Sequence, residues 1–276
     1  MKLLELIERE AVDLRRERVD ATTILPSSRQ LGELMELLWS TVFYESFHHD
    51  DNDEDFIRQR LLTIYNKLTM QVGKIISTKT DCRLQDARSA AMVFIGRIHH
   101  IKHMVLTDVD AVMKKDPAAS SAHEIIASYP SIRALLYYRV AHELLMIGVP
   151  VLPRMITELA HSATGIDIHP GATIGEYCAI DHGTGVVIGE TCIIGHHVTL
   201  YQGVTLGAKG FVYDEEGNAQ RVARHPILGD NVTVYSNASI LGRITVGHDS
   251  IIGGNVWLTE SVPPYSKITQ NSAKYV

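Results

Sequence analysis

The sequence predicts an α+β protein in which an N-terminal α-helical domain is followed by a left-handed parallel β-helix of hexapeptide repeats. Two observations predict this fold class: a helical spacing of apolar residues over the first 160 residues, and a strict six-residue spacing of aliphatic residues after residue 165. The predicted domains are residues 1–160 and 161–276. The length of 276 residues suits two modest domains, and 45% hydrophobic residues allow a sizeable core.

The first predicted domain carries apolar residues three and four positions apart, as an amphipathic helix requires. This spacing is clear over residues 56–65, 88–104 and 131–146. Glycine and proline are sparse before residue 148, which also favours helices. We therefore expect one helix over each of these three stretches.

In the second predicted domain an aliphatic residue recurs at every sixth position, apart from two interruptions. Inward-facing Ile, Leu and Val at this spacing, often followed by glycine, are typical of a β-helix, whose short strands stack around a continuous core. The alternative, a sandwich of short strands, would show turns every 8–12 residues or so. The repeat positions are Ile168, Ile174, Ile180, Ile188, Ile194, Leu200, Leu206, Leu228, Val234, Ile240, Val246, Ile252 and Leu258.

Composition excludes several functional classes. A formal net charge of -6 argues against nucleic acid or an anionic membrane as the main partner. Three scattered cysteines do not make a disulfide framework or a zinc ribbon. The charged N-terminus is unlike a signal peptide, and the longest apolar run, residues 146–152, is too short to span a bilayer. We therefore expect a cytoplasmic protein.

The first interruption of the repeat, residues 181–185, contains the best candidate for a catalytic group. Loops that leave a rigid scaffold commonly carry function. His182 suits a general base, because the ordinary pKa of imidazole is about 6.5. Asp167 lies about one coil earlier, where its carboxylate could orient the imidazole. The alternative for His182 is a loop histidine with a structural hydrogen bond.

The second interruption, residues 208–227, ends in Arg224 and His225. A guanidinium can hold a carboxylate with two hydrogen bonds. The alternative is a surface arginine beside a loop histidine. In the helical domain, Asp116 precedes a proline and would ordinarily only end a helix.

A metal site is the competing interpretation of the histidines. His99 and His103 are four residues apart, but no glutamate completes an H-E-x-x-H pattern. Three histidines of the repeat region could bind zinc, as in left-handed β-helix carbonic anhydrases. We expect no metal. The histidines that could serve are His169, His182, His196, His197 and His225.

The two interruptions supply the block Asp-His-Gly-Thr-Gly at 181–185 and the segment Arg-His-Pro at 224–226. This combination is specific, and with it the chain resembles the serine acetyltransferases over residues 80–262. Further similar segments are 167–170, 186–191, 202–207 and 240–242, with 116–118 and 139–142 in the helical domain.

The resemblance implies transfer of an acetyl group from acetyl-CoA to the hydroxyl of L-serine, giving O-acetyl-L-serine in cysteine biosynthesis. No enzyme nucleophile is needed, so the resemblance assigns no role to the cysteines. The implied residues are His182 as general base, Asp167 as its dyad partner, Asp116 and Asp181 facing the serine ammonium, and Arg224 and His225 near its carboxylate. Gly207, Ser236 and Gly254 match the positions that bind CoA in the groove between adjacent β-helices.

The resemblance also implies partners. Family members form trimers that usually pair into hexamers through their helical halves, and L-cysteine inhibits them at the serine site. A terminal isoleucine docks into O-acetylserine sulfhydrylase, but this sequence ends in Val276, which leaves that complex open. The loop over 209–220 is longer than the glycine-rich loop common in the family, and the corner over 234–238 carries bulkier residues than the usual glycine-alanine corner.

Three other functions remain as alternatives. The first is a hexapeptide acyltransferase with a sugar or aromatic acceptor. Asp116, Asp181 and Arg224 together favour an amino-acid acceptor instead. The second is the zinc-dependent carbonic anhydrase, which would lose activity on chelation. The third is a non-catalytic scaffold, in which His182→Ala would change nothing.

Overall fold

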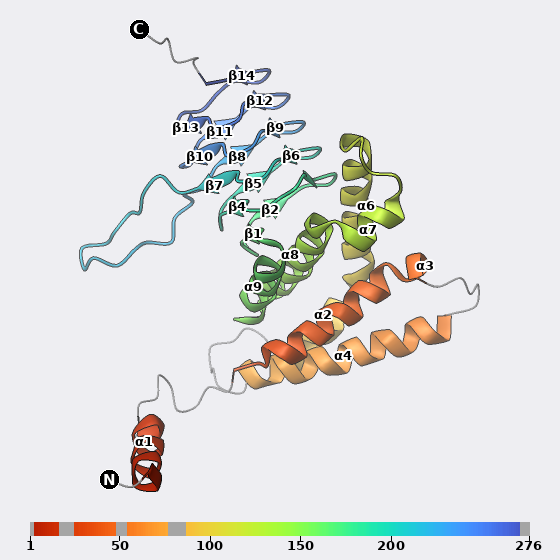
Figure 1. The fold of residues 1–276 in the computed structure, drawn as a ribbon, viewed down its shortest axis with the longest axis vertical. Helices are drawn as coiled ribbons and strands as arrows, with labels where there is room; N and C mark the ends of the chain where they lie inside the picture. The colour runs from red at the N-terminus through yellow and green to blue at the C-terminus, as the bar shows by residue number, and fades with distance from the viewer. Residues whose placement is uncertain (1–2, 17–24, 48–53, 77–86, 271–276) are drawn as a thin grey trace.

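The computed structural model describes residues 3–16, 25–47, 54–76 and 87–270. Within these ranges a helical half precedes a stack of short strands (Figure 1). No helix in the described ranges is long and apolar enough to cross a membrane. The helices are α1 (Leu3–Arg16), α2 (Ser28–Val42), α3 (Tyr44–Phe47), α4 (Glu54–Ile76), α5 (Ala87–Ile95), α6 (Ile98–Lys115), α7 (Ala122–Ser128), α8 (Pro130–Met146) and α9 (Leu152–Thr164).

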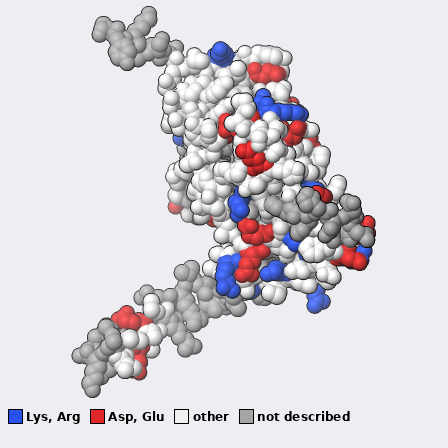
Figure 2. Space-filling view, turned by 45° about the vertical axis from the view of Figure 1, so that its right-hand side comes forward, with Lys and Arg blue, Asp and Glu red and all other residues white. Residues whose placement is uncertain are grey.

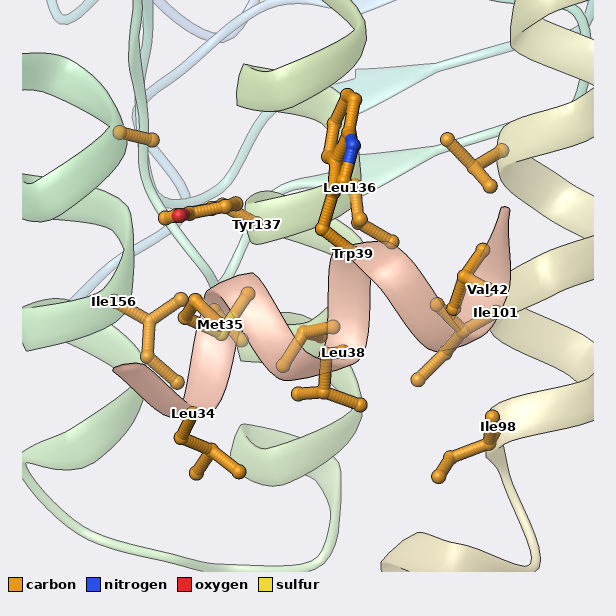
Figure 3. Close-up of a cluster of buried hydrophobic side chains, with 14 of the residues drawn as sticks. Leu34, Met35, Leu38, Trp39, Val42, Ile98, Ile101, Leu136, Tyr137 and Ile156 are labelled. Carbon is orange, nitrogen blue, oxygen red and sulfur yellow. The ribbon is translucent and has the colours of Figure 1, made fainter. Parts of the chain in front are cut away.

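The helical half has its own apolar core, in which α2 lies between α4 and α9 and reaches α6 and α8. The side chain of Ser27 caps α2 by accepting a hydrogen bond from the backbone N–H of Gln30. One face of α2 then buries Leu34, Met35 and Leu38 completely or almost so (Figure 3). Because these residues are three and four positions apart, they form a single stripe that faces the neighbouring helices.

The helical spacing predicted three helices and located them only partly. The expected helices over 56–65 and 131–146 lie within α4 and α8. A single helix over 88–104 is wrong, because a turn at Gly96 and Arg97 separates α5 from α6. Glycine is a poor helix former, and the apolar spacing continues across the turn since Phe94, Ile98 and Ile101 all enter the same core. Periodicity therefore could not reveal the break.

The second half is a left-handed parallel β-helix with three flat sheets, as predicted. Sheet A has the order β1-β4-β7-β10-β13, sheet B the order β11-β8-β5-β2, and sheet C the order β14-β12-β9-β6-β3. All pairs of neighbouring strands are parallel. The strands are β1 (Asp167–Ile168), β2 (Thr173–Ile174), β3 (Ala179–Ile180), β4 (Val187–Ile188), β5 (Ile193–Ile194), β6 (Thr199–Leu200), β7 (Thr205–Gly207), β8 (Ile227–Leu228), β9 (Thr233–Val234), β10 (Ser239–Leu241), β11 (Thr245–Val246), β12 (Ile251–Ile252), β13 (Trp257–Leu258) and β14 (Lys267–Ile268).

The thirteen repeat positions are confirmed as the inward-facing residues of β1 to β13. Every one of them, from Ile168 to Leu258, is buried. They stack in register, as in the pairing of Ile168 with Ile188 and of Ile188 with Leu206. The strand β14 lies outside the predicted pattern and adds Ile268 to the end of sheet C. The stacked aliphatic side chains form the continuous core that holds the coils together.

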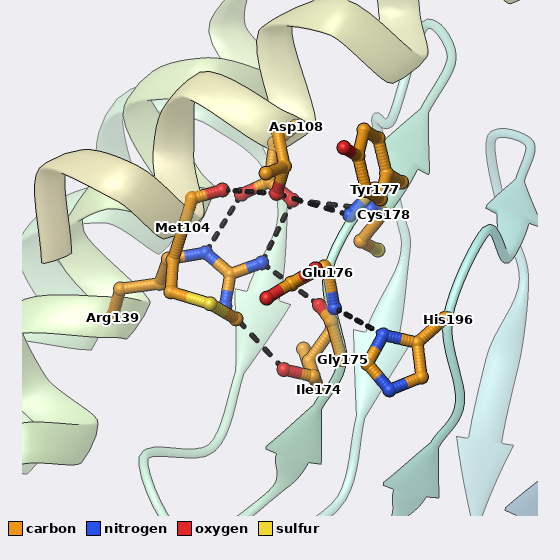
Figure 4. A network of polar contacts seen from close by, with 10 residues as sticks. Met104, Asp108, Arg139, Ile174, Gly175, Glu176, Tyr177, Cys178 and His196 are labelled. Carbon is orange, nitrogen blue, oxygen red and sulfur yellow. Dashed lines mark hydrogen bonds and ion pairs between the residues drawn. The ribbon is translucent and has the colours of Figure 1, made fainter. Parts of the chain in front are cut away.

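A buried ion pair joins the helical half to the first coil. Asp108 of α6 and Arg139 of α8 form two hydrogen bonds of 2.7 Å, and their side chains are 0% and 5% exposed. Arg139 also donates to the backbone carbonyl of Gly175, while Asp108 accepts from the backbone N–H of Cys178 (Figure 4). Because the charges are paired and hydrogen-bonded, α6 and α8 are held in a defined register against the β-helix.

The predicted boundary after residue 160 falls inside α9, which ends at Thr164, and stays a prediction. The helix α8 contributes to both cores: Leu136 and Tyr137 enter the helical cluster, whereas Leu135 and Tyr138 enter that of the β-helix.

On the face shown in Figure 2, acidic and basic side chains are interspersed, in line with the modest net charge of -6.

Candidate active site

The first interruption of the repeat forms a loop at the corner between sheets C and A. It follows β3 and leads into β4, so that Ile180 and Ile188 are eight residues apart rather than six. His182 has a φ of 56° and Gly183 a φ of 83°, both in the left-handed region. A Cβ atom at Gly183 would lie 2.5 Å from Cδ1 of Ile166, so only glycine fits there. The turn directs His182 outward, and its side chain is 71% exposed.

Beside this corner the helical half closes a cavity of about 550 Å³. Asp116 reaches it from the C-terminal end of α6, and Tyr129 from the residue before α8. Asp181 and His182 line the opposite side, with 3.9 Å between Oδ1 of Asp181 and Nε2 of His182. The cavity therefore collects two carboxylates, one imidazole and one phenol, from two parts of the chain. We call Asp116, Tyr129, Asp181 and His182 the His182 corner.

Hydrogen bonds hold the Asp116 carboxylate in place. The Tyr129 hydroxyl donates to Oδ2 of Asp116 over 2.6 Å, and the backbone N–H of Ala118 donates to Oδ1 over 2.8 Å. The bond from Tyr129 is the main reason that the pKa of Asp116 is lowered, and the Ala118 bond and nearby His182 act in the same direction. The same bond raises the pKa of Tyr129 to about 12. Near neutral pH this side of the cavity therefore carries a fixed negative charge.

Arg224 and His225 lie at a different corner, between sheets A and B. They close the long loop that leaves β7, just before β8 begins. Nη2 of Arg224 is 3.1 Å from a carboxylate oxygen of Glu190, and His225 packs against Thr191. His225 is only 7% exposed. Burial, and after it the Arg224 charge, lower the pKa of His225 to about 4, so the imidazole is neutral at physiological pH. We call Glu190, Thr191, Arg224 and His225 the Arg224 corner.

The two corners are separated within one chain. The His182 corner follows strands of sheet C, whereas the Arg224 corner follows strands of sheet A, so the width of sheet A lies between them. The resemblance implies one serine site for Asp116, Asp181, His182, Arg224 and His225. Within one copy of the described chain, the first three lie together and Arg224 lies with His225 at the other corner. A shared site therefore stays a prediction.

Asp167, the predicted dyad partner, lies at the start of β1, opposite Val187 of β4. Its carboxylate accepts a hydrogen bond of 3.2 Å from Nη1 of Arg154 on α9. Among the described residues, no ion pair within 4.0 Å joins Asp167 to His182. The dyad therefore stays a prediction.

Asp167 also belongs to the one group of potential metal ligands found in the described ranges, together with Glu158 and His161. The guanidinium of Arg154 contacts both carboxylates of this group and already supplies a positive charge. None of the five histidines weighed for a zinc site is a member of it.

Two of the three residues predicted to bind CoA stack on successive coils at the corner of His182. Ser236 follows β9 and Gly254 follows β12, and a Cβ atom at Gly254 would lie 3.2 Å from the carbonyl oxygen of Ser236. Gly207 ends β7 and lies at the corner of Arg224 instead. The bulky Tyr235 beside Ser236 stacks on Tyr201 with ring centroids 5.0 Å apart, outside the coil.

The long second interruption projects away from the coils as an arm over residues 208–226 (Figure 1). A bridge between Tyr213 and Ala219 closes its outer part. Phe211 and Tyr213 are exposed on the arm, and Phe211 lies within 5.9 Å of the Arg224 guanidinium. The arm is therefore connected to the Arg224 corner rather than to the His182 corner.

Sequence reasoning missed several groups that the fold places at these corners. Tyr129 carried no signal, because it lies thirteen residues from Asp116 and precedes an ordinary helix. Glu190 and Thr191 stood within a matched segment but had no assigned role. Gln202 is also notable, since its Oε1 is buried without a hydrogen-bond partner among the described residues. The available signal for Glu190 and Thr191 was a carboxylate and a hydroxyl side chain two and three positions after the repeat residue Ile188.

Comparison with known proteins agrees with the fold and the motifs. A family model described as bacterial transferase hexapeptide (six repeats) matches residues 225–260. The plasmid serine acetyltransferase of Synechococcus elongatus is 44% identical over 261 residues, which cover 89% of this chain and 82% of that protein. The serine acetyltransferase of Mycobacterium tuberculosis is 45% identical over 157 residues, covering 57% of this chain and 65% of that protein.

Solved structures extend the likeness to the helical half. Serine acetyltransferase isoform 3 of Entamoeba histolytica, in complex with cysteine, has a TM-score of 0.76 at 30% identity and covers 99% of this chain and 95% of that one. Soybean serine acetyltransferase, complexed with serine, has a TM-score of 0.60 at 25% identity and covers 90% of this chain and 99% of that one.

Proposed function

Because the chain belongs to the serine acetyltransferase family and is an acyltransferase that acetylates serine, we propose that His182 is the general base of this reaction. The observation that carries the proposal is the convergence of Asp116, Asp181 and His182 on one cavity. Serine has an ammonium group close to its hydroxyl. Two carboxylates beside an exposed imidazole match that arrangement, since they attract the ammonium while the hydroxyl faces the base.

The chemistry needs no covalent enzyme intermediate. Nε2 of His182 takes the proton from the serine hydroxyl, whose oxygen forms a bond to the acetyl carbon of acetyl-CoA. The bond from that carbon to sulfur breaks, and the imidazolium returns its proton to the departing thiolate, which leaves as CoA. Cys178 and Cys192 cannot serve as nucleophiles, because both are buried and burial raises the pKa of each thiol to about 12.

We assign Asp167 as the group that orients His182, in a complex where the two approach each other. Asp116 is the better-defined contact for the serine ammonium, since Tyr129 and Ala118 keep it ionised and in place. Asp181 lies on the same wall of the cavity as His182 and completes the pair.

The serine carboxylate is assigned to Arg224 and His225, supplied by a second copy of the chain. A guanidinium and a neutral imidazole N–H together offer hydrogen bonds to an anion. Since sheet A separates the two corners in one copy, a ring of copies would bring the Arg224 corner of one against the His182 corner of the next. A trimer is the smallest such ring that suits a three-sided β-helix, and two trimers joined by their helical halves would make a hexamer.

The same arrangement suits acetyl-CoA as co-substrate. Ser236 and Gly254 lie on the coils above His182, and Gly207 lies at the Arg224 corner. An intersubunit groove would therefore place all three along one path that ends at the base. A Cβ atom at Gly254 would lie 3.2 Å from the carbonyl oxygen of Ser236, so a side chain there would narrow this path.

L-cysteine fits the site as an inhibitor. It carries the same ammonium and carboxylate as serine and differs only in sulfur replacing oxygen, so the charged groups would hold both. The Entamoeba histolytica structure in complex with cysteine is consistent with this. Docking of O-acetylserine sulfhydrylase would involve residues 271–276, including Val276, which lie outside the described residues.

The test is release of free thiol from acetyl-CoA in the presence of L-serine, compared between the wild type and His182→Asn. Asparagine tolerates the left-handed backbone at this position, so the loop should keep its shape. We expect turnover to fall by roughly 10²–10⁴-fold, the usual contribution of general acid–base catalysis. An unchanged melting temperature would serve as the control for folding.

Two results would contradict the proposal. A near-normal turnover in His182→Asn would remove His182 from the base role. A rate with a sugar hydroxyl but none above background with L-serine would overturn the acceptor. A loss of wild-type activity on chelation would instead favour the zinc-dependent alternative.

A further inference from the structure

Thr191 makes an unusually complete set of contacts at the Arg224 corner. It follows β4 and lies one coil before Arg224 and His225. Its hydroxyl oxygen accepts hydrogen bonds from the backbone N–H groups of Arg224 (3.0 Å) and His225 (3.1 Å). The same oxygen is 2.8 Å from Nδ1 of the His225 ring. One side chain thus binds both the backbone and the imidazole of the residues assigned to the carboxylate.

These contacts determine which ring nitrogen of His225 carries the proton. The backbone N–H of Thr191 points at Nδ1 over 3.1 Å, and an amide N–H can only donate. Nδ1 must therefore be an acceptor without a proton. The Thr191 hydroxyl already accepts two amide protons, so its own proton is available to donate to Nδ1 as well. The neutral ring is left with its proton on Nε2.

Nε2 is the part of the ring that remains available to a ligand. Among the described residues, no group forms a hydrogen bond with Nε2 of His225. Gln202 Oε1 is the only side-chain nitrogen or oxygen atom in these residues that is fully buried without a hydrogen-bond partner, so Nε2 is not fully buried. Nε2 therefore reaches solvent. The ring lies directly over Gly189, where a Cβ atom would be 2.3 Å from Nε2. The close approach is possible only because Gly189 has no side chain.

The surrounding charges disfavour a second proton on the ring. The groups that face His225 electrostatically are the cations of Arg224 and Arg243, the imidazole of His169 and the carboxylate of Glu190. Nη1 of Arg243 also donates to the carbonyl oxygens of Thr191 (2.6 Å) and His225 (3.0 Å), which fixes the two segments to each other. Burial of the ring, and after it two guanidinium groups against one carboxylate, make the neutral imidazole the stable form.

We propose that Thr191 is a positioning residue that locks His225 as a neutral imidazole with its proton on Nε2, so that His225 is a permanent hydrogen-bond donor to the carboxylate of the amino-acid substrate. The inference rests on the proposed function for the carboxylate. Beyond that function, the proposal excludes His225 as an acid or a base in the reaction, and it assigns to Thr191 the choice of the ring nitrogen that carries the proton. A protonated or Nδ1-protonated ring would direct a donor at the Thr191 amide and break the arrangement.

The first arm of the experiment reads the ring directly, by nuclear magnetic resonance of the enzyme labelled with ¹⁵N at histidine. His225→Gln identifies the His225 signals among the 14 histidines by their loss. In the wild type we expect a neutral ring with its proton on Nε2 at every pH from about 5 to 8. The lower part of this range lies below the ordinary imidazole pKa of about 6.5, where a solvent-exposed histidine would be protonated. Thr191→Val keeps the backbone N–H that faces Nδ1 but removes the hydroxyl that accepts from the Arg224 and His225 amides and contacts Nδ1. The ring is then no longer held against that N–H, so the variant should admit the other tautomer or a proton within that range. Thr191→Ser, which keeps the hydroxyl, should restore the wild-type signal.

The second arm measures serine kinetics in the same variants. Loss of one well-directed hydrogen bond to a charged group should raise the KM for L-serine roughly tenfold in Thr191→Val, with kcat changed by less than about threefold. Thr191→Ser should stay within about twofold of the wild type. A merely structural role for Thr191 would lower melting temperature and kcat together, without a selective change in KM or in the tautomer.

The two arms separate the possible failures. An Nδ1-protonated or charged His225 in the wild type at pH 7 would overturn the inference, whatever the kinetics show. The expected tautomer combined with an unchanged serine KM in both Thr191→Val and His225→Gln would overturn the carboxylate role of His225 and leave the tautomer assignment standing. If Thr191→Val does not fold, the wild-type and Thr191→Ser spectra still decide the tautomer, and the serine KM of His225→Gln decides the carboxylate role.

Discussion

The two loops that interrupt the hexapeptide repeat place a histidine at neighbouring corners of the same β-helix, but they do so in opposite ways. His182 is 71% exposed and has one carboxylate 3.9 Å away, whereas His225 is 7% exposed and its Nδ1 is fully engaged by Thr191. The first imidazole is exposed beside the cavity, whereas the second is buried and its Nδ1 atom is held by Thr191. The comparison teaches that residue type and loop position alone do not distinguish two histidines; the burial of the ring and the partners of each ring nitrogen do.

The corners also differ in charge. Asp116 and Asp181 make the His182 corner acidic, while Arg224 and Arg243 outweigh Glu190 at the other. A zwitterionic amino acid needs both, yet sheet A separates them in one chain. In the proposed function the two corners are complementary halves of one site, and the largest effect we predict comes from bringing them together.

Mixing two inactive variants is expected to restore activity. His182→Asn removes the base and Arg224→Ala removes the carboxylate contact, so each variant alone should be nearly inactive. If every site uses His182 of one copy and Arg224 of the next, random mixing in equal amounts should restore about a quarter of wild-type activity, because half the copies are intact at each corner. Coexpression followed by the thiol-release assay measures this.

The control is a mixture of the two purified variants that have not exchanged subunits, which should stay inactive. No recovery in the coexpressed oligomers would mean that both corners serve one site within a chain, and the comparison between them would lose its meaning.

A methyl group under the buried histidine should affect the Arg224 corner selectively. In Gly189→Ala the new Cβ would lie 2.1 Å from Cδ2 of His225, so the ring must move. We expect the KM for serine to rise roughly tenfold, through loss of a hydrogen bond to a charged group, and unfolding to become easier by about 1–3 kcal/mol, the usual cost of overpacking. Serine kinetics and urea unfolding measure the two effects.

Gly210→Ala on the projecting arm is the matched control. Nothing lies within 4 Å of its Cβ position, and it should change stability by less than about 0.5 kcal/mol. Equal effects of the two substitutions would show that His225 does not depend on the space above Gly189.

The buried imidazole should also make the protein sensitive to acid. The pKa of His225 is about 4 in the folded chain, below the ordinary value of 6.5. At a pH between these two values, His225 is therefore protonated in the unfolded chain and neutral in the folded chain. The free energy of unfolding should therefore fall as the pH drops from about 6.5 to 4, by at most about 3 kcal/mol. Urea unfolding between pH 7 and 4 measures this slope.

His225→Gln should flatten the slope without abolishing it, because the pKa of His169 is also lowered by burial. An identical slope in the wild type and in His225→Gln would contradict the picture of a buried neutral imidazole at the Arg224 corner.

Much of the fold follows from local pattern. Thirteen aliphatic positions in steps of six predicted strands β1 to β13, because an inward-facing residue recurs once on every side of a three-sided coil. The same counting located the two interruptions, and with them His182, Arg224 and His225. It failed at Gly96, where the apolar spacing crosses a break between two helices, and at β14, which follows a longer connection.

The contacts that distinguish the two corners depend on tertiary structure. Tyr129 meets Asp116 only because α6 and α8 pack in one register against the first coil, and Thr191 meets His225 only because the coils stack with the arm excluded. The sequence by itself determined the repeat, its interruptions and the residue types within them, since those depend on spacing along the chain. Only the tertiary structure decided that His182 is exposed while His225 is buried with its Nδ1 atom held by Thr191. It also decided that the groups proposed for the ammonium and for the carboxylate lie at different corners, because coil stacking brings together atoms that are unrelated by their spacing along the chain.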